Sequence, residues 1–283
     1  MSKRDIKQPN ICLYSSGRSG SNYLLQYLQS DARYVSMGEP FTLDNVWNRS
    51  IFLENCGRLL RSKKINKEQY LHILKSCCSS HSVCSIKKVI KIENLLSMLI
   101  DVEKSKNVSK GIIFKYMPWY EPFIGLDFPN ISNQVDYLIY NYRKNTLKQW
   151  ISQSKALITQ EWLTYNKSKA INTKVQWDKQ KYIGFATEAK NTHNKAIQHF
   201  VQFDGPKAMI CYEEISENNK NTIAFLNKTL EISKIDCHIG TPQLPIKQSS
   251  DISLEHNFTN PEEFLQDINT INDFIFLRKP DGI

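Results

Sequence analysis

A loop rich in glycine and serine at residues 14–22, Tyr-Ser-Ser-Gly-Arg-Ser-Gly-Ser-Asn, has the residue types that bind phosphate. An apolar run that predicts a β-strand precedes the loop, and a run with helical spacing follows it. Glycines let the backbone approach a ligand closely, and the N–H groups at a helix start attract anions. Arg18 adds a planar cation suited to phosphate oxygens. The predicted phosphate-binding residues are Ser16, Gly17, Arg18, Ser19, Gly20, Ser21 and Asn22.

A second cationic motif follows a later strand. The sequence Val-Asp-Tyr-Leu-Ile-Tyr at residues 135–140 predicts this strand, and Arg143 comes shortly after it. A helix is expected from about Asn145, and Ser152 lies on that helix. Ligands of α/β proteins bind at the carboxyl ends of the strands. Arg143 is therefore expected to face the same crevice as the glycine-rich loop.

Short β-rich runs alternate with longer helical runs, which predicts an α/β fold with a central, mainly parallel sheet flanked by helices. Residues 45–105 should form a polar, mostly helical insert, and residues 238–253 a loop. No domain boundary is visible, so residues 1–283 are expected to form a single domain. Strands are expected at 11–14, 111–117, 135–140 and 208–212. Helices are expected at 23–28, from about 145, at 187–201, at 221–230 and from about 260.

Together, the loop and the Arg143…Ser152 motif resemble the nucleotide-binding motifs of the sulfotransferases that use 3′-phosphoadenosine 5′-phosphosulfate (PAPS). The form that these two motifs take in this sequence is most similar to that of the Stf0-type sulfotransferases, which carry Gln-x-x-Ser on the helix. The resemblance spans roughly residues 10–265, although Asn22 and Lys144 stand where relatives often have Thr and Arg. Further similar segments follow in the same order at residues 38–41, 111–119, 149–152, 212–215 and 246–249.

The resemblance implies a P-loop-like sulfotransferase core that moves a sulfuryl group from PAPS and releases adenosine 3′,5′-bisphosphate (PAP). It implies that Arg18 and the loop amides hold the 5′-phosphosulfate. Arg143 and Ser152 would hold the 3′-phosphate. Lys247 and Gln248 would belong to a late loop that closes over the nucleotide. No metal is expected, because arginine and lysine can neutralise the leaving phosphate.

The acceptor implied by the resemblance is a hydroxyl, or a nitrogen, of a carbohydrate or a small natural product. Glu39 corresponds to the carboxylate that these sulfotransferases use as general base, and a positioned base is what attack by a hydroxyl requires. His72 and His81 are alternative bases. The residues predicted to contact the acceptor are Glu39, Trp47, Lys115 and Trp119.

The net charge of +9 favours anionic partners and leaves two alternative functions open. The first is a P-loop kinase or another nucleotide-binding protein, but the GxxxxGK[ST] pattern and a clear magnesium-binding aspartate are absent from the sequence. The second is a module that binds nucleic acid or anionic lipid. In such a module the basic residues are expected to cluster, whereas the basic residues of this chain are dispersed along the sequence. We therefore expect no nucleic-acid partner.

The cellular context is predicted from apolar runs and cysteines. No run approaches the roughly 18–20 apolar residues of a membrane span, and the start is polar, so a cytoplasmic protein without an integral membrane segment is expected. An odd number of cysteines, seven, then indicates reduced thiols. Cys77, Cys78, His81 and Cys84 could bind a metal, although their spacing fits zinc poorly. A homodimer is compatible with the sequence.

Overall fold

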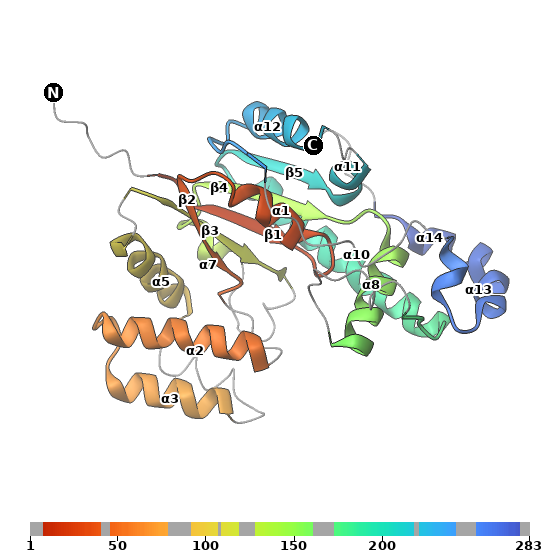
Figure 1. Cartoon of the computed structure of the whole chain (residues 1–283), viewed down its shortest axis with the longest axis horizontal. Helices are drawn as coiled ribbons and strands as arrows, with labels where there is room; N and C mark the ends of the chain where they lie inside the picture. Colours follow the sequence, from red (N-terminus) through yellow and green to blue (C-terminus); the bar gives the residue numbers. More distant parts are fainter. Residues whose placement is uncertain are drawn as a thin grey trace.

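A parallel sheet forms the centre of the structure (Figure 1). The computed structural model describes residues 8–40, 46–78, 92–106, 109–118, 128–160, 173–217, 221–241 and 253–277. Five strands pair in parallel in the order β2-β3-β1-β4-β5. They are β1 (Ile11–Ser15), β2 (Tyr34–Gly38), β3 (Gly111–Tyr116), β4 (Tyr137–Tyr142) and β5 (Lys207–Cys211). The predicted α/β fold with a mainly parallel central sheet is confirmed.

Helices cover both faces of this sheet (Figure 1). Successive strand residues point to opposite faces, so Ile11 and Leu13 of β1 join one core, while Cys12 and Tyr14 join the other. Helices α1 (Ser21–Leu28) and α12 (Thr222–Ile232) complete the first core. The second core is completed by α2 (Val46–Arg61), α3 (Lys67–Cys78), α5 (Ile92–Lys106), α7 (Phe128–Ser132) and α10 (Lys179–Gln202).

A third core beside the sheet fixes helix α8 (Thr146–Thr159), which carries Ser152. Trp150 of α8 packs edge-on against Trp177, with ring centroids 5.5 Å apart. The chain end contributes α13 (Pro261–Asp267) and α14 (Asn272–Ile275) to this core. At the start of α8, the Asn145 side chain accepts the Lys148 N–H at 2.8 Å, a standard helix cap. Helix α11 (Tyr212–Glu217) follows β5 directly.

The described part of the predicted insert at 45–105 is helical, and consists of α2, α3 and α5. Arg58 of α2 joins two of these helices, because its Nη1 lies 2.6 Å from Oε1 of Glu103 in α5. The same guanidinium pairs with Glu54 one turn earlier in α2, at 2.9 Å. The pair with Glu103 therefore attaches α2 to α5, and the pair with Glu54 supports α2 itself.

Two sequence predictions differ from the structure. Strand β2 was not predicted, because its sequence Tyr-Val-Ser-Met-Gly lacks an apolar run, and only β3 pairs with this edge strand. Helix α10 begins at Lys179 rather than at 187, where Asp178 caps it by accepting the N–H of Lys181 at 3.0 Å. Strand β4 begins and ends two residues later than expected. That residues 1–283 form a single domain stays a prediction.

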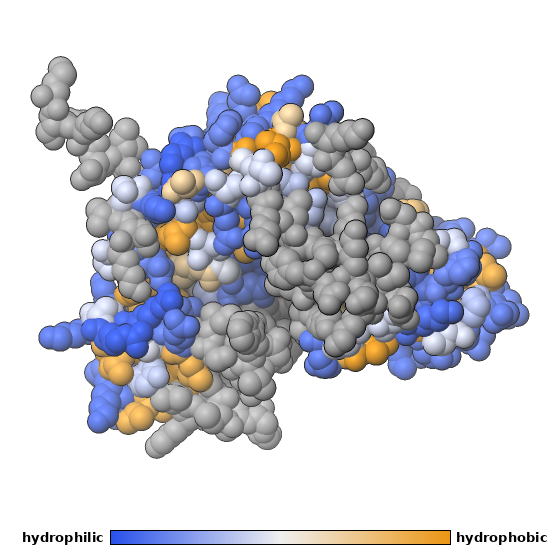
Figure 2. Space-filling view, in the orientation of Figure 1, coloured by the Kyte–Doolittle hydropathy of each residue, from blue (hydrophilic) through white to orange (hydrophobic). Residues whose placement is uncertain are grey.

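The described surface is mostly polar. Figure 2 shows hydrophilic residues over much of one face, with apolar residues in small separate groups. The helices therefore turn their apolar sides toward the sheet. Among the helices that the structure describes, none has both the length and the apolar character needed to cross a bilayer.

Candidate functional site

The glycine-rich loop lies where the strand order reverses. Strand β1 has β3 on one side and β4 on the other, and the chain visits β2 and β3 before it crosses to β4 and β5. In such sheets the loops at the carboxyl ends diverge and leave a crevice for a ligand. Residues 16–20 follow β1 at this point, and Arg143 follows β4. The fold thus brings the two predicted motifs to the same crevice.

Two residues of the loop have left-handed backbone conformations. Arg18 has φ of 56°, and Gly20, which precedes α1, has φ of 77°. A Cβ atom on Gly20 would lie 2.0 Å from Cδ2 of Tyr212, so the ring excludes any side chain there. The Ser19 hydroxyl closes the turn by donating to the Ser16 carbonyl at 2.6 Å. The loop is therefore a tight turn that leads into the positive end of the α1 dipole.

Side chains from β4 and α8 bind the loop carbonyls. Asn141 Nδ2 donates to the Ser19 carbonyl at 2.9 Å, and Gln149 Nε2 donates to the Gly17 carbonyl. Because a trans peptide places its C=O and N–H on opposite sides, the N–H groups that follow these carbonyls point away from β4 and α8. Backbone N–H groups that are not bound within the loop are the kind of donor that anion sites use. The geometry fits the predicted phosphate-binding loop.

The arginines predicted to bind two different phosphates lie in one cluster. Arg18 donates to Ser152 Oγ from Nη2 at 2.8 Å and from Nε at 3.1 Å. Arg143 is only 5% exposed, and its Nη1 lies 3.4 Å from the Arg18 carbonyl oxygen. Burial, and secondly the charge of Arg143, lower the pKa of Arg18 to about 10. Burial likewise lowers the pKa of Arg143. Arg143 is buried and Arg18 is partly exposed, and two cations this close together favour an anionic ligand beside them.

Tyr212 and Glu213, the first two residues of α11, hold Arg143 in place. The guanidinium carbon of Arg143 lies 5.0 Å from the centroid of the Tyr212 ring. Glu213 accepts the backbone N–H of Lys144 at 2.9 Å and of Asn145 at 3.0 Å. Burial would raise the pKa of Glu213, but these hydrogen bonds outweigh it and lower the pKa. Its carboxylate lies 3.9 Å from Arg143 Nε, so it only partly neutralises the cluster.

The predicted base Glu39 is connected to the loop through Lys115. Glu39 follows β2 and forms an ion pair with Lys115 of β3, whose side chain is 1% exposed. Lys115 Nζ also donates to Oδ1 of Asn22, in the first turn of α1, at 2.7 Å. The structure therefore brings Glu39, Lys115 and Asn22 together at the carboxyl edge of the sheet, where they can contact a ligand held by the loop.

Several predicted residues cannot be placed in the site. Trp47 belongs to α2 and His72 to α3, but their side chains lie outside the described residues. The other predictions in this group also lie outside the described residues: Trp119, Lys247, Gln248, His81 and Cys84. The side chains of Cys77 and Cys78 do as well. Within the described ranges, no group of three His, Cys, Asp or Glu side chains could hold a metal ion.

Asn141 and Gln149 bind the loop, although neither was predicted as a site residue and Gln149 was matched only as the first residue of the Gln-x-x-Ser motif. Both are buried, with 0% and 2% exposure, and both bind loop carbonyls. A polar residue near the end of an otherwise apolar and aromatic strand is the signal that could have identified Asn141. For Gln149 the signal is the Gln-x-x-Ser spacing itself, which places it one turn before Ser152 on the same helix.

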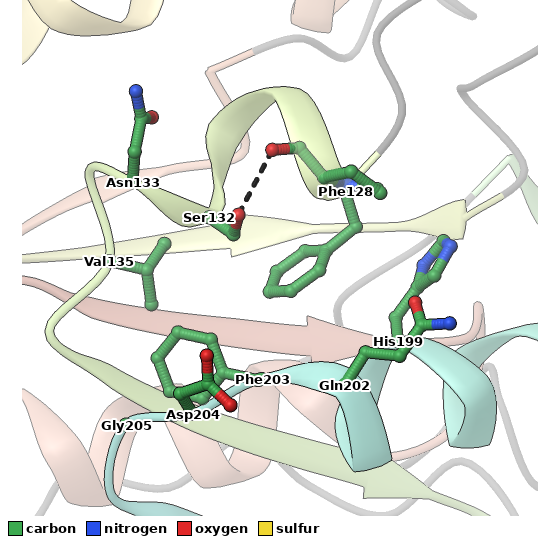
Figure 3. A pocket seen from close by; sticks show the side chains of 10 residues that line it. Phe128, Ser132, Asn133, Val135, His199, Gln202, Phe203, Asp204 and Gly205 are labelled. Carbon is green, nitrogen blue, oxygen red and sulfur yellow. Dashed lines mark hydrogen bonds between the residues drawn. The ribbon is translucent and has the colours of Figure 1, made fainter.

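A cavity of about 320 Å³ lies elsewhere, between α7 and the carboxyl end of α10 (Figure 3). Phe128, His199 and Phe203 line it, together with Val135 and Gly205, which precede β4 and β5. It is therefore at the amino edge of the parallel sheet, opposite the glycine-rich loop. The cavity is not part of the candidate site.

Comparison with known proteins gives no family for this chain. No protein-family model and no curated protein matches it. Because a fold alone does not determine a function, the functional argument depends on the chemistry of the site.

Proposed function

We propose that this protein is a PAPS-dependent sulfotransferase, which transfers a sulfuryl group to a hydroxyl or nitrogen of a carbohydrate or small natural product. The observation that carries the proposal is the cluster of partly exposed Arg18 and buried Arg143, next to a loop whose carbonyls accept hydrogen bonds from Asn141 and Gln149. The proposal includes the cytoplasmic location expected from the sequence.

The nucleotide would occupy the crevice at the end of β1. Its 5′-phosphosulfate fits the loop N–H groups, the α1 dipole and Arg18. Its 3′-phosphate fits Arg143 and Ser152. Arg18 and Ser152 are hydrogen-bonded to each other, so the two anionic groups would be bound by one connected set of side chains. This connection supports a ligand with two anionic groups rather than one.

The transfer needs positioning and electrostatic stabilisation. The acceptor oxygen forms a bond to sulfur, while the bond between sulfur and the bridging oxygen of the 5′-phosphate breaks. Glu39 takes the acceptor proton, and PAP leaves with the electron pair of the broken bond. Negative charge develops on the leaving phosphate, next to Arg18 and the loop N–H groups. Lys115 orients the Glu39 carboxylate through their ion pair.

Calorimetry with PAP and AMP tests the nucleotide assignment. The wild type should bind PAP at least about tenfold more tightly than AMP, because AMP lacks the 3′-phosphate. Arg143→Ala should remove most of this preference. The adjacent, exposed Lys144 provides the matched control, and Lys144→Ala should retain the preference. Equal affinities of the wild type for PAP and AMP would contradict the proposal.

Turnover separates a sulfotransferase from a kinase. PAP release from PAPS should depend on an added mixture of carbohydrate and phenolic acceptors, and should not require a divalent metal. Magnesium-dependent turnover of ATP without PAPS turnover would instead support a kinase or nucleotide hydrolase.

A further inference from the structure

One side of helix α8 carries a buried polar stripe. Gln149, Ser152 and Lys155 are spaced three residues apart and are 2%, 6% and 3% exposed. Residues three apart on a helix are neighbours, so the stripe is continuous. Gln149 binds the Gly17 carbonyl, and Ser152 accepts from Arg18. Lys155 extends the stripe by one turn beyond the residues already placed in the site.

Lys155 is a buried cation with a neutral partner. Its Nζ donates to Oδ1 of Asn257 at 2.8 Å. Among the described residues this is the one hydrogen bond of the ammonium group, and no carboxylate there forms an ion pair with it. An ammonium group has three donors, and burying it beside a single amide oxygen is costly. The burial lowers the pKa of Lys155. Such an arrangement is expected where a ligand supplies the missing negative charge.

Asn257 places this cation beside the chain end. It ends a short 3₁₀-helix, Leu254–Asn257, and its Nδ2 donates to the Leu254 carbonyl at 3.2 Å. Asn257 is neutral, so it would not become an unpaired charge if Lys155 broke this hydrogen bond. Lys155 can therefore exchange this hydrogen bond for one to an anionic oxygen.

We propose that Lys155 is a specificity-determining residue of the nucleotide site, which binds the phosphate that distinguishes PAP from AMP one turn beyond Ser152. The inference rests on the proposed function. It adds a third cation to Arg18 and Arg143, and it makes α8 the helix that selects a nucleotide with two phosphates.

Three variants test the role of Lys155 by calorimetry with PAP and AMP. Lys155→Met should lower PAP affinity about tenfold to a hundredfold and change AMP affinity less than about twofold. Asn257→Asp should also lower PAP affinity about tenfold, because the new carboxylate neutralises Lys155. Lys148→Met is the matched control, since Lys148 is exposed on the same helix, and it should leave both affinities unchanged.

Thermal unfolding of the ligand-free variants distinguishes binding from a structural role. Asn257→Asp should melt at or above the wild-type temperature, because it pairs a buried cation. If Lys155 only stabilises the packing of Asn257 and the chain end, Asn257→Asp will retain PAP affinity, and Lys155→Met will lower only the melting temperature. That result would overturn the role of Lys155 and leave the proposed function intact. A wild type without preference for PAP over AMP would overturn both.

Discussion

Arg18 is predicted to destabilise the ligand-free protein while it stabilises the nucleotide complex. Burial and the neighbouring Arg143 lower its pKa to about 10. The ordinary value lies above 12, so the difference corresponds to roughly 3 kcal/mol against the charged form. Because the folded pKa is the lower one, this penalty is fully present at pH 7. It disappears only as the pH rises above about 10, where the folded protein loses the proton.

Arg18→Met should therefore stabilise the protein without ligand. Methionine has a similar length and carries no charge, so the desolvation penalty of roughly 3 kcal/mol disappears. The loss of the hydrogen bonds of Arg18, which include two to Ser152 Oγ, offsets about 1–2 kcal/mol of that gain. The net effect is a gain of about 1–2 kcal/mol, which raises Tm by about 2–6 °C. Scanning calorimetry measures this change, and Arg61→Met, at an exposed position, is the control.

The same variant should lose nucleotide binding. In the transfer reaction, removal of a charged donor at a phosphate costs about 2–4 kcal/mol of transition-state stabilisation. This cost corresponds to roughly a 30- to 1000-fold lower kcat/KM. Added PAP should raise the wild-type Tm but hardly change that of Arg18→Met. If the variant melts below the wild type without ligand, the desolvation cost assigned to Arg18 is wrong. If it binds PAP normally, the loop is not the phosphate site.

Three further variants probe the base, the loop and the acid stability of the fold. Glu39→Gln should lower kcat about 10²- to 10⁴-fold and abolish the acidic limb of the pH–rate profile, with PAP affinity unchanged in calorimetry. Gly20→Ala should cost about 2–5 kcal/mol in urea unfolding, because it adds left-handed strain and a 2.0 Å clash with Tyr212. Asp31 is 6% exposed and accepts Arg33 Nη2 at 2.7 Å. Burial alone would raise its pKa, but the hydrogen bonds from Arg33 lower it, so its stabilisation is present above about pH 4 and is lost at lower pH. Asp31→Asn should cost about 2 kcal/mol at pH 7 and flatten the acid decline of Tm; an unchanged acid decline would refute this.

The local features of the site were predictable from the sequence. The loop at residues 16–20 lies between a strand and a helix, as its composition predicts, because glycine tolerance of left-handed angles is a property of single residues. Asn145 caps α8 at the expected position, because capping involves residues three apart. The alternation of strands and helices likewise predicts a parallel sheet.

The contacts between distant segments were decided only by the tertiary structure. Arg18 and Ser152 are 134 residues apart in the sequence, and their pairing depends on β1 and β4 being neighbours. Lys115 reaches both Glu39 and Asn22 because β3 lies between β1 and the edge strand β2. Strand β2 itself forms through its pairing with β3, since its five residues include Ser36 and Gly38 and form no unbroken apolar run. Local patterns determine which residues can bend, cap or bind, whereas strand order determines which of them meet.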